Sequence, residues 1–217
     1  MDIEKTEIIS EKFATKQLFV GISLGSAVTA ESGIAVIDRN MHLVRIDKAF
    51  NLNDIQAYIK ALSPAENLIL CVDLPKNTNI VTNKWRYEAK NTQALRLRGL
   101  DFAKLSWTER FSDRGLELCN SLNSLGADVY RYSCYYTKTA LRLNSPYKAR
   151  SPVACKNLQM SIKSVLKVSG IPTNLIAISG LEAIMGAYTA WKIASSKENI
   201  GYKCIGNFRN IPIVSAI

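Results

Sequence analysis

The chain has 217 residues, of which 47% are hydrophobic and 21% are charged, with 11 glycines and 6 prolines. This composition is typical of one globular domain and excludes disordered, collagen-like and repeat proteins. The formal net charge of +10 favours an anionic partner.

The first predicted elements are three strands. Residues 1–16 read as a flexible leader, followed by a single domain over 17–217. The apolar, β-branched run at 17–23 predicts a central strand, and the alternating residues at 33–38 and 42–48 predict the two arms of a hairpin. The domain is therefore expected to open with antiparallel strands.

A helix and a buried strand follow. Asn53 can cap a helix over 54–62, and the wholly apolar residues 67–72 predict a buried strand that is reached by a crossover. A long helical region is expected over 84–110, and a shorter helix over 116–125 stops at a glycine.

The last third of the chain continues the alternation of strands and helices. Residues 127–132 are strand-like, and a tyrosine-rich basic loop follows them. Ser151 and the proline after it predict the start of a helix that runs to about residue 168. A further helix is expected to begin at Ser179, and residues 202–214 predict a final strand.

Several classes of protein are excluded by what the sequence lacks. No apolar stretch reaches the roughly 18 residues of a membrane span, and the first residues, MDIEKTEIISEK, do not resemble a signal peptide. We therefore expect a cytoplasmic protein with no membrane partner. The five separated cysteines favour buried, reduced thiols, and the single histidine, His42, argues against histidine-based catalysis.

Positive charge is concentrated in one part of the chain. No acidic residue lies between Asp128 and Glu182, and tyrosines are interleaved with the basic residues there, namely Arg131, Lys138, Arg142, Lys148, Arg150, Lys156, Lys163 and Lys167. This mixture predicts binding of nucleic acid or another phosphorylated ligand, although a solvated helix face is the alternative. A second basic stretch, 84–114, is half offset by acids and favours intrahelical ion pairs.

The motifs occur in an order that is found in a known family. The segments VGISLGSAVTAESGIAVID, CVDLP, RYEAKNTQALRLRG, ADVYRY and GLEAIMGAYTAW resemble those of the predicted nucleases with a ribonuclease H-like fold, domain of unknown function four-twenty-nine. The resemblance covers almost the whole chain. It implies an α/β, ribonuclease H-like fold with a mixed sheet, antiparallel in its first three strands and then parallel, flanked by helices.

The resemblance also implies a hydrolase that cleaves phosphodiesters with Mg²⁺ or Mn²⁺. Two ions about 4 Å apart would need several convergent carboxylates. The matching positions give Asp73 and Glu182 as catalytic residues and metal ligands, and Glu31, in the loop of the first hairpin, is a further candidate ligand. Ser23 stands where the family has its first-strand Asp, so the site is expected to be weakened or inactive.

Each of these acids has a structural alternative. Asp73 could cap the turn that follows its strand, and Glu182 could form a capping box with Ser179. Glu31 could be an ordinary exposed turn acid.

Three more residues match the family at its acidic and basic positions. Glu88 and Asp128 could complete a metal site, and Arg86 could bind a phosphate through both guanidinium nitrogens. Glu88 could instead pair with Lys84, and Arg86 with Glu88 or Asp73. Asp128 could instead be a residue at the start of its strand.

Three functions remain open from the sequence. The first is a metal-dependent nuclease, and the second is a degenerate relative that binds nucleic acid or protein. The third is a binder of a small phosphorylated molecule, which would need a closed pocket. Convergence of carboxylates in one cleft would favour the first.

Overall fold

The structure is a computed structural model that describes residues 17–62, 64, 67–73, 114–143, 146–147, 150–196, 201–208 and 210–217. The predicted leader 1–16 and the predicted helix 84–110 lie outside the described residues, and so do Arg86, Glu88 and Lys148.

One mixed sheet organises the fold. Its seven strands lie in the order β3-β2-β1-β4-β5-β7-β6, and they are β1 (Leu18–Ser23), β2 (Ser32–Ile37), β3 (Leu43–Ala49), β4 (Leu68–Asp73), β5 (Asp128–Tyr132), β6 (Tyr202–Phe208) and β7 (Ile211–Ala216). Strands β1, β2 and β3 are antiparallel, whereas β4, β5 and β7 continue from β1 in parallel. This topology confirms the predicted ribonuclease H-like fold class.

The C-terminal stretch differs from its prediction. It forms two antiparallel strands, β6 and β7, where the sequence predicted one. Asn210, whose φ is 68°, lies in the turn between them. Arg209 and Asn210 are the only residues between the two strands, and two polar residues were too weak a signal to predict a turn there.

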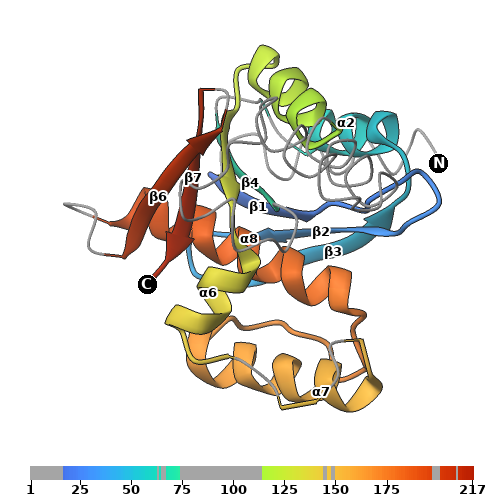
Figure 1. Ribbon diagram of the computed structural model, residues 1–217, viewed down its shortest axis with the longest axis vertical. Coiled ribbons are helices and arrows are strands. Elements are labelled where there is room, and N and C mark those ends of the chain that lie inside the picture. The colour runs from blue at the N-terminus through green and yellow to red at the C-terminus, as the bar shows by residue number, and fades with distance from the viewer. Residues whose placement is uncertain are drawn as a thin grey trace, which may run out of the picture.

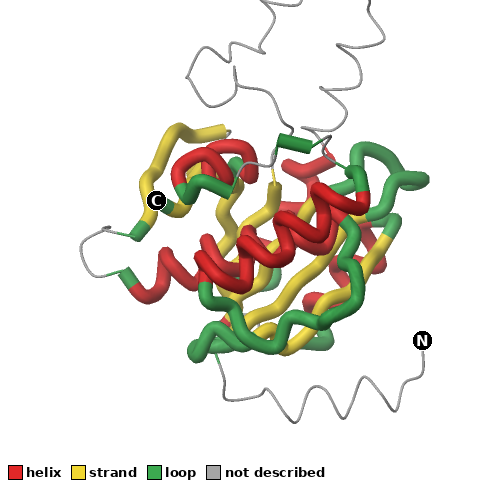
Figure 2. The backbone as a smooth tube through the Cα atoms, turned by 90° about the horizontal axis from the view of Figure 1, so that it is seen from below, coloured by secondary structure: helices red, strands yellow, loops and turns green. Residues whose placement is uncertain are grey.

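Helices cover both faces of the sheet (Figures 1 and 2). The described helices are α2 (Leu52–Lys60), a helical segment at 114–124, α6 (Cys134–Ala140), α7 (Pro152–Ser161) with a π-helical continuation at Ile162–Leu166, and α8 (Ile178–Ser195). Helix α2 and the segment 114–124 pack on one face. Helix α8 packs on the other face, and α6 and α7 pack against α8.

The two-residue period of the strands separates two apolar cores. In β1, Leu18, Val20 and Ile22 join the core under α2 and the segment 114–124, whereas Phe19 joins the core under α8. Ser23 lies two residues after Gly21, so both lie on the α8 face of β1. Helix α8 is very close at Gly21, because a Cβ there would overlap the backbone of Ala183 and Ala187.

Two helix starts differ from the sequence predictions. Helix α2 begins after Asn51, whose side chain accepts a hydrogen bond from the Asp54 amide at 2.8 Å, so Asn53 is not the cap. Helix α8 begins at Ile178, one residue before the predicted start at Ser179, and its N-cap residue Ala177 provides no side-chain cap.

The predicted basic loop is also corrected. Its first part is helix α6, which begins after Ser133, and the Ser133 side chain accepts a hydrogen bond from the Tyr136 amide. By contrast, the predicted cap Ser151 is confirmed, with Pro152 as the first residue of α7.

All five cysteines are free thiols, four of them buried as predicted, whereas Cys204 is exposed. In the part of the chain that the structure describes, none of the helices combines the length and apolar character needed to cross a membrane.

Candidate functional site

Five side chains meet at the carboxyl ends of three neighbouring strands. Ser23 is the last residue of β1, Asp73 is the last residue of β4, and Cys134 follows β5 at the start of α6. Lys138 comes one turn later in α6, and Glu182 projects from α8. This edge of an open α/β sheet is where ligands usually bind.

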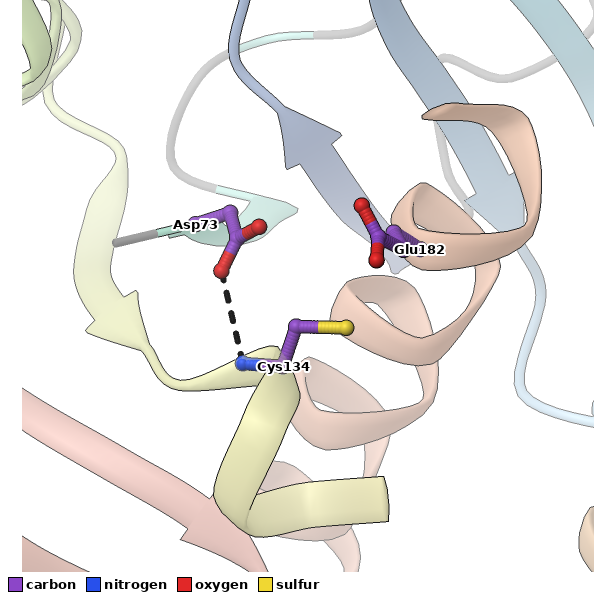
Figure 3. A group of neighbouring side chains, drawn as sticks. All are labelled: Asp73, Cys134 and Glu182. Atoms are coloured by element: carbon purple, nitrogen blue, oxygen red, sulfur yellow. Dashed lines mark hydrogen bonds between the residues drawn. The ribbon is translucent and has the colours of Figure 1, made fainter. Parts of the chain in front are cut away.

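The three potential ligand residues face one another (Figure 3). One ligand atom from each of Asp73, Cys134 and Glu182 lies within 4.8 Å of the other two. Asp73 is 8% exposed, and its Oδ1 accepts a hydrogen bond from the Cys134 amide at 3.3 Å. The structure therefore brings together the two acids that the sequence singled out.

Both carboxylate oxygens of Glu182 have partners. The Lys138 ammonium donates to Oε1 at 2.7 Å, and the Ser23 hydroxyl donates to Oε2 at 3.4 Å. Tyr132 on β5 donates its hydroxyl to the Glu182 backbone carbonyl at 2.5 Å, which ties α8 to the sheet at this point. Glu182 is thus held by three different elements.

Burial sets the charges in the cluster. The pKa of the Asp73 carboxyl lies well above its ordinary value, first because it is buried and next because Glu182 is nearby. Burial and Glu182 also raise the pKa of the Cys134 thiol, so the thiol is neutral. Burial opposes the charge on Lys138, but it is outweighed by Cys134, which acts only at the high pH where the lysine would lose its proton, and by the Glu182 carboxylate. The pKa of Lys138 is therefore raised, and its ammonium stays charged.

These residues do not fit the pair of hard divalent ions that the resemblance implies. Asp73, Cys134 and Glu182 could surround one ion, but Mg²⁺ and Mn²⁺ prefer oxygen ligands and a two-ion site needs further carboxylates. Ser23 supplies no charge, Cys134 is a protonated thiol, and Lys138 already pairs with Glu182.

Glu31, the third predicted ligand, is not in the group of ligand atoms that lie within 4.8 Å of one another. Its Oε1 accepts a hydrogen bond from the Ser179 hydroxyl at 2.5 Å, and its other oxygen lies 3.7 Å from Lys48 Nζ. The contact with Ser179 ties the first hairpin to the start of α8. The predicted capping box of Ser179 and Glu182 is not formed. The Ser179 hydroxyl donates to Glu31, and the Glu182 carboxylate accepts from Lys138.

Arg131 is not a surface residue, so its predicted contact with nucleic acid is wrong. It is fully buried, and its Nη2 donates to the Asp73 backbone carbonyl at 3.0 Å. The strand period could have revealed this, because Arg131 shares a face with buried Val129 and points away from the α8 side.

The other predicted basic residues divide into two groups. The Lys138 side chain is only 18% exposed and pairs with Glu182, so it belongs to the cluster and not to an open surface. Exposed basic side chains are Arg142, Arg150, Lys156, Lys163 and Lys167.

Sequence reasoning missed the association of Cys134 and Lys138 with the two acids. The signal was available: the residues are four apart, at the start of a segment that follows a strand, and that spacing places both on one helix face. Reading the segment as a loop hid the spacing.

Comparisons with known proteins give no support at the level of sequence for the resemblance to the predicted-nuclease family. No family model and no curated protein matches the chain. Two solved structures of RuvC from Thermus thermophilus are similar to it, each covering 82% of this chain and 95% of RuvC at 12% identity. The structure in complex with a Holliday junction substrate gives a TM-score of 0.44, and the other gives 0.41. The fold class rests on the order and direction of the strands.

Proposed function

We propose that this protein binds nucleic acid through an outer layer formed by the described residues 134–143, 146–147 and 150–167, and that it does not hydrolyse phosphodiesters by a two-metal mechanism. The observation that carries the proposal is the charge of this layer. It contains no acidic residue, and it presents five exposed basic side chains over α8, namely Arg142, Arg150, Lys156, Lys163 and Lys167.

The physical basis of binding is the exchange of small ions for lysine and arginine. A polyphosphate backbone is surrounded by condensed cations, and a basic surface releases them when it binds. Exposed rings are also present: Tyr135 is 39% exposed and Tyr147 is 52% exposed. Rings of this kind stack on bases without reading their sequence, so we expect binding with little sequence preference.

The cluster beside this layer supports binding without hydrolysis. Ser23 takes the place of an acid, and Lys138 donates to Glu182 at 2.7 Å. The motifs favour a relationship to the predicted-nuclease family, and we assign the chain as a degenerate member of it. One observation favours hydrolysis as the second candidate, namely the approach of Asp73 and Glu182 within a group that could hold an ion.

The experiment is a titration of labelled single-stranded DNA, duplex DNA and RNA with the pure protein at several salt concentrations. The double variant Arg150→Gln/Lys163→Gln removes two charges from the outer layer. Arg39→Gln/Lys60→Gln removes two exposed charges outside it. We expect the first double variant to reduce the slope of log K against log salt by about 2, and the control to leave it unchanged.

Two results would contradict the proposal. One is the absence of binding at low salt, and the other is equal weakening by both double variants. The same nucleic acids are incubated with Mg²⁺ or Mn²⁺, and we expect no cleavage. Cleavage that is lost in Asp73→Asn would establish the hydrolase instead.

A further inference from the structure

The carboxylate cluster already contains a cation, which is the ammonium of Lys138. Its Nζ lies 2.7 Å from Glu182 Oε1, and the two side chains are 18% and 25% exposed. An ion pair this sheltered is screened less by salt than a surface pair. Lys138 also acts on Asp73, whose pKa it lowers against the larger effect of burial.

The position of Lys138 follows from the chain around it. Helix α6 starts directly after β5, and the Cys134 amide is fixed to Asp73 Oδ1 at 3.3 Å. Lys138 is one turn further along the same helix, so its long side chain reaches Glu182 on α8. Helix α6 therefore has two roles: its Cys134 amide binds Asp73, and its Lys138 ammonium binds Glu182.

A divalent ion would have to compete with this ammonium. The ligand atoms of Asp73, Cys134 and Glu182 lie within 4.8 Å of one another, so an ion between them would be close to Nζ. Two positive centres this near repel each other strongly where burial limits screening. The ion would also lose Glu182 Oε1 as a ligand while Lys138 stays in place.

We infer that Lys138 is the resident cation of this site and closes it to divalent metal ions. Removing its charge opens a metal site with ligands from Asp73, Cys134 and Glu182. Because one ligand is a thiol, this site takes a thiophilic ion such as Co²⁺ or Zn²⁺ in preference to Mg²⁺. The inference does not rest on nucleic-acid binding, and its test is independent of it.

The test measures Co²⁺ binding by absorption spectroscopy and by calorimetry. Lys138→Met keeps an apolar stem and removes the charge. Lys60→Met makes the same replacement at an exposed lysine on the other face of the sheet. We expect Lys138→Met to bind Co²⁺ at least tenfold more tightly than the wild type and Lys60→Met to match the wild type. A thiolate-to-cobalt band should appear in Lys138→Met and disappear in Lys138→Met/Cys134→Ser.

Clear results would overturn the inference. The first is that the wild type binds Co²⁺ as tightly as Lys138→Met does. The second is that Lys138→Met folds but does not gain affinity for Co²⁺. The third is that the gain in Co²⁺ affinity persists when Asp73→Asn is added. Circular dichroism establishes folding. Lys138→Arg, which keeps the charge, is the second variant: it should bind Co²⁺ no better than the wild type, and tight binding by it would contradict the role of charge.

Discussion

At the scale of single residues, the main feature of the cluster is Asp73, a buried carboxyl with too few donors and positive charges around it to favour its ionised form. Asp73 has one amide donor on its side chain and shares its surroundings with a second carboxylate. Its neighbours of opposite charge are Lys138, which pairs with Glu182, and Arg131, which bonds the Asp73 backbone carbonyl. The protonated form of Asp73 is therefore favoured in the folded protein.

This imbalance predicts a pH dependence of stability. Because the pKa of Asp73 is higher in the folded than in the unfolded state, the folded state holds the proton more tightly. The stability that this proton contributes is fully present at pH values below the pKa of Asp73 in the unfolded state. It is lost as the pH rises through the pKa of Asp73 in the folded state. Asp73→Asn, which cannot ionise, should gain stability relative to the wild type between pH 5 and pH 8, by on the order of 1 kcal/mol.

Urea unfolding at the two pH values measures this difference. Asp128→Asn, which removes an exposed carboxylate at the start of β5, controls for the change in net charge. A smaller gain for Asp73→Asn at pH 8 than at pH 5 would contradict the sign of the effect.

At the scale of elements, the start of helix α2 depends on one side chain. Asn51 satisfies the Asp54 amide at 2.8 Å and also donates from Nδ2 to Asp54 Oδ2 at 2.6 Å. The exposed Asn53, two residues later, lies inside the first turn of α2. The two asparagines therefore differ in role although their sequence surroundings are similar.

We expect Asn51→Ala to reduce the free energy of unfolding by about 1 kcal/mol, because an amide at the helix start loses its acceptor. The matched variant Asn53→Ala should change it by less than about 0.5 kcal/mol. Chemical denaturation of both variants checks this. Equal losses would show that the cap has been assigned to the wrong residue.

At the scale of the whole molecule, α8 holds the sheet and the cluster together. It packs on β1, β2 and β4, and it carries Glu182 to the strand ends. This requires close approach at Gly21, where a Cβ would overlap backbone atoms of Ala183 and Ala187 and lie 2.7 Å from the carbonyl carbon of Gly186. Backbone in a packed helix has little room to yield.

Gly21→Ala should therefore destabilise the protein by about 3 kcal/mol, at the upper end of the usual cost of overpacking. Gly126→Ala is the comparison, because a Cβ there meets no atom within 4 Å and only its φ of 89° opposes the change. That strain costs about 1 to 2 kcal/mol. Thermal and urea unfolding would measure both, and a Gly21→Ala variant as stable as Gly126→Ala would contradict the close packing.

The sequence by itself determined the positions of five strands and the concentration of positive charge between Asp128 and Glu182. Apolar and β-branched runs predicted β1, β2, β3, β4 and β5 within a residue or two, because a strand's pattern depends on its own residues and on which face is buried. The absence of acids between Asp128 and Glu182 is likewise a property of the chain alone. Motif order was enough to predict the mixed sheet.

Only the tertiary structure decided what surrounds each charge. Ser23, Asp73, Lys138 and Glu182 are far apart in the chain, and they meet because parallel strands end at one edge while α8 crosses above them. Lys138 and Arg131 look alike in a list of basic residues, yet one neutralises Glu182 and the other is buried on the opposite face. Side-chain environment depends on contacts between distant segments, and a local pattern of residues does not encode those contacts.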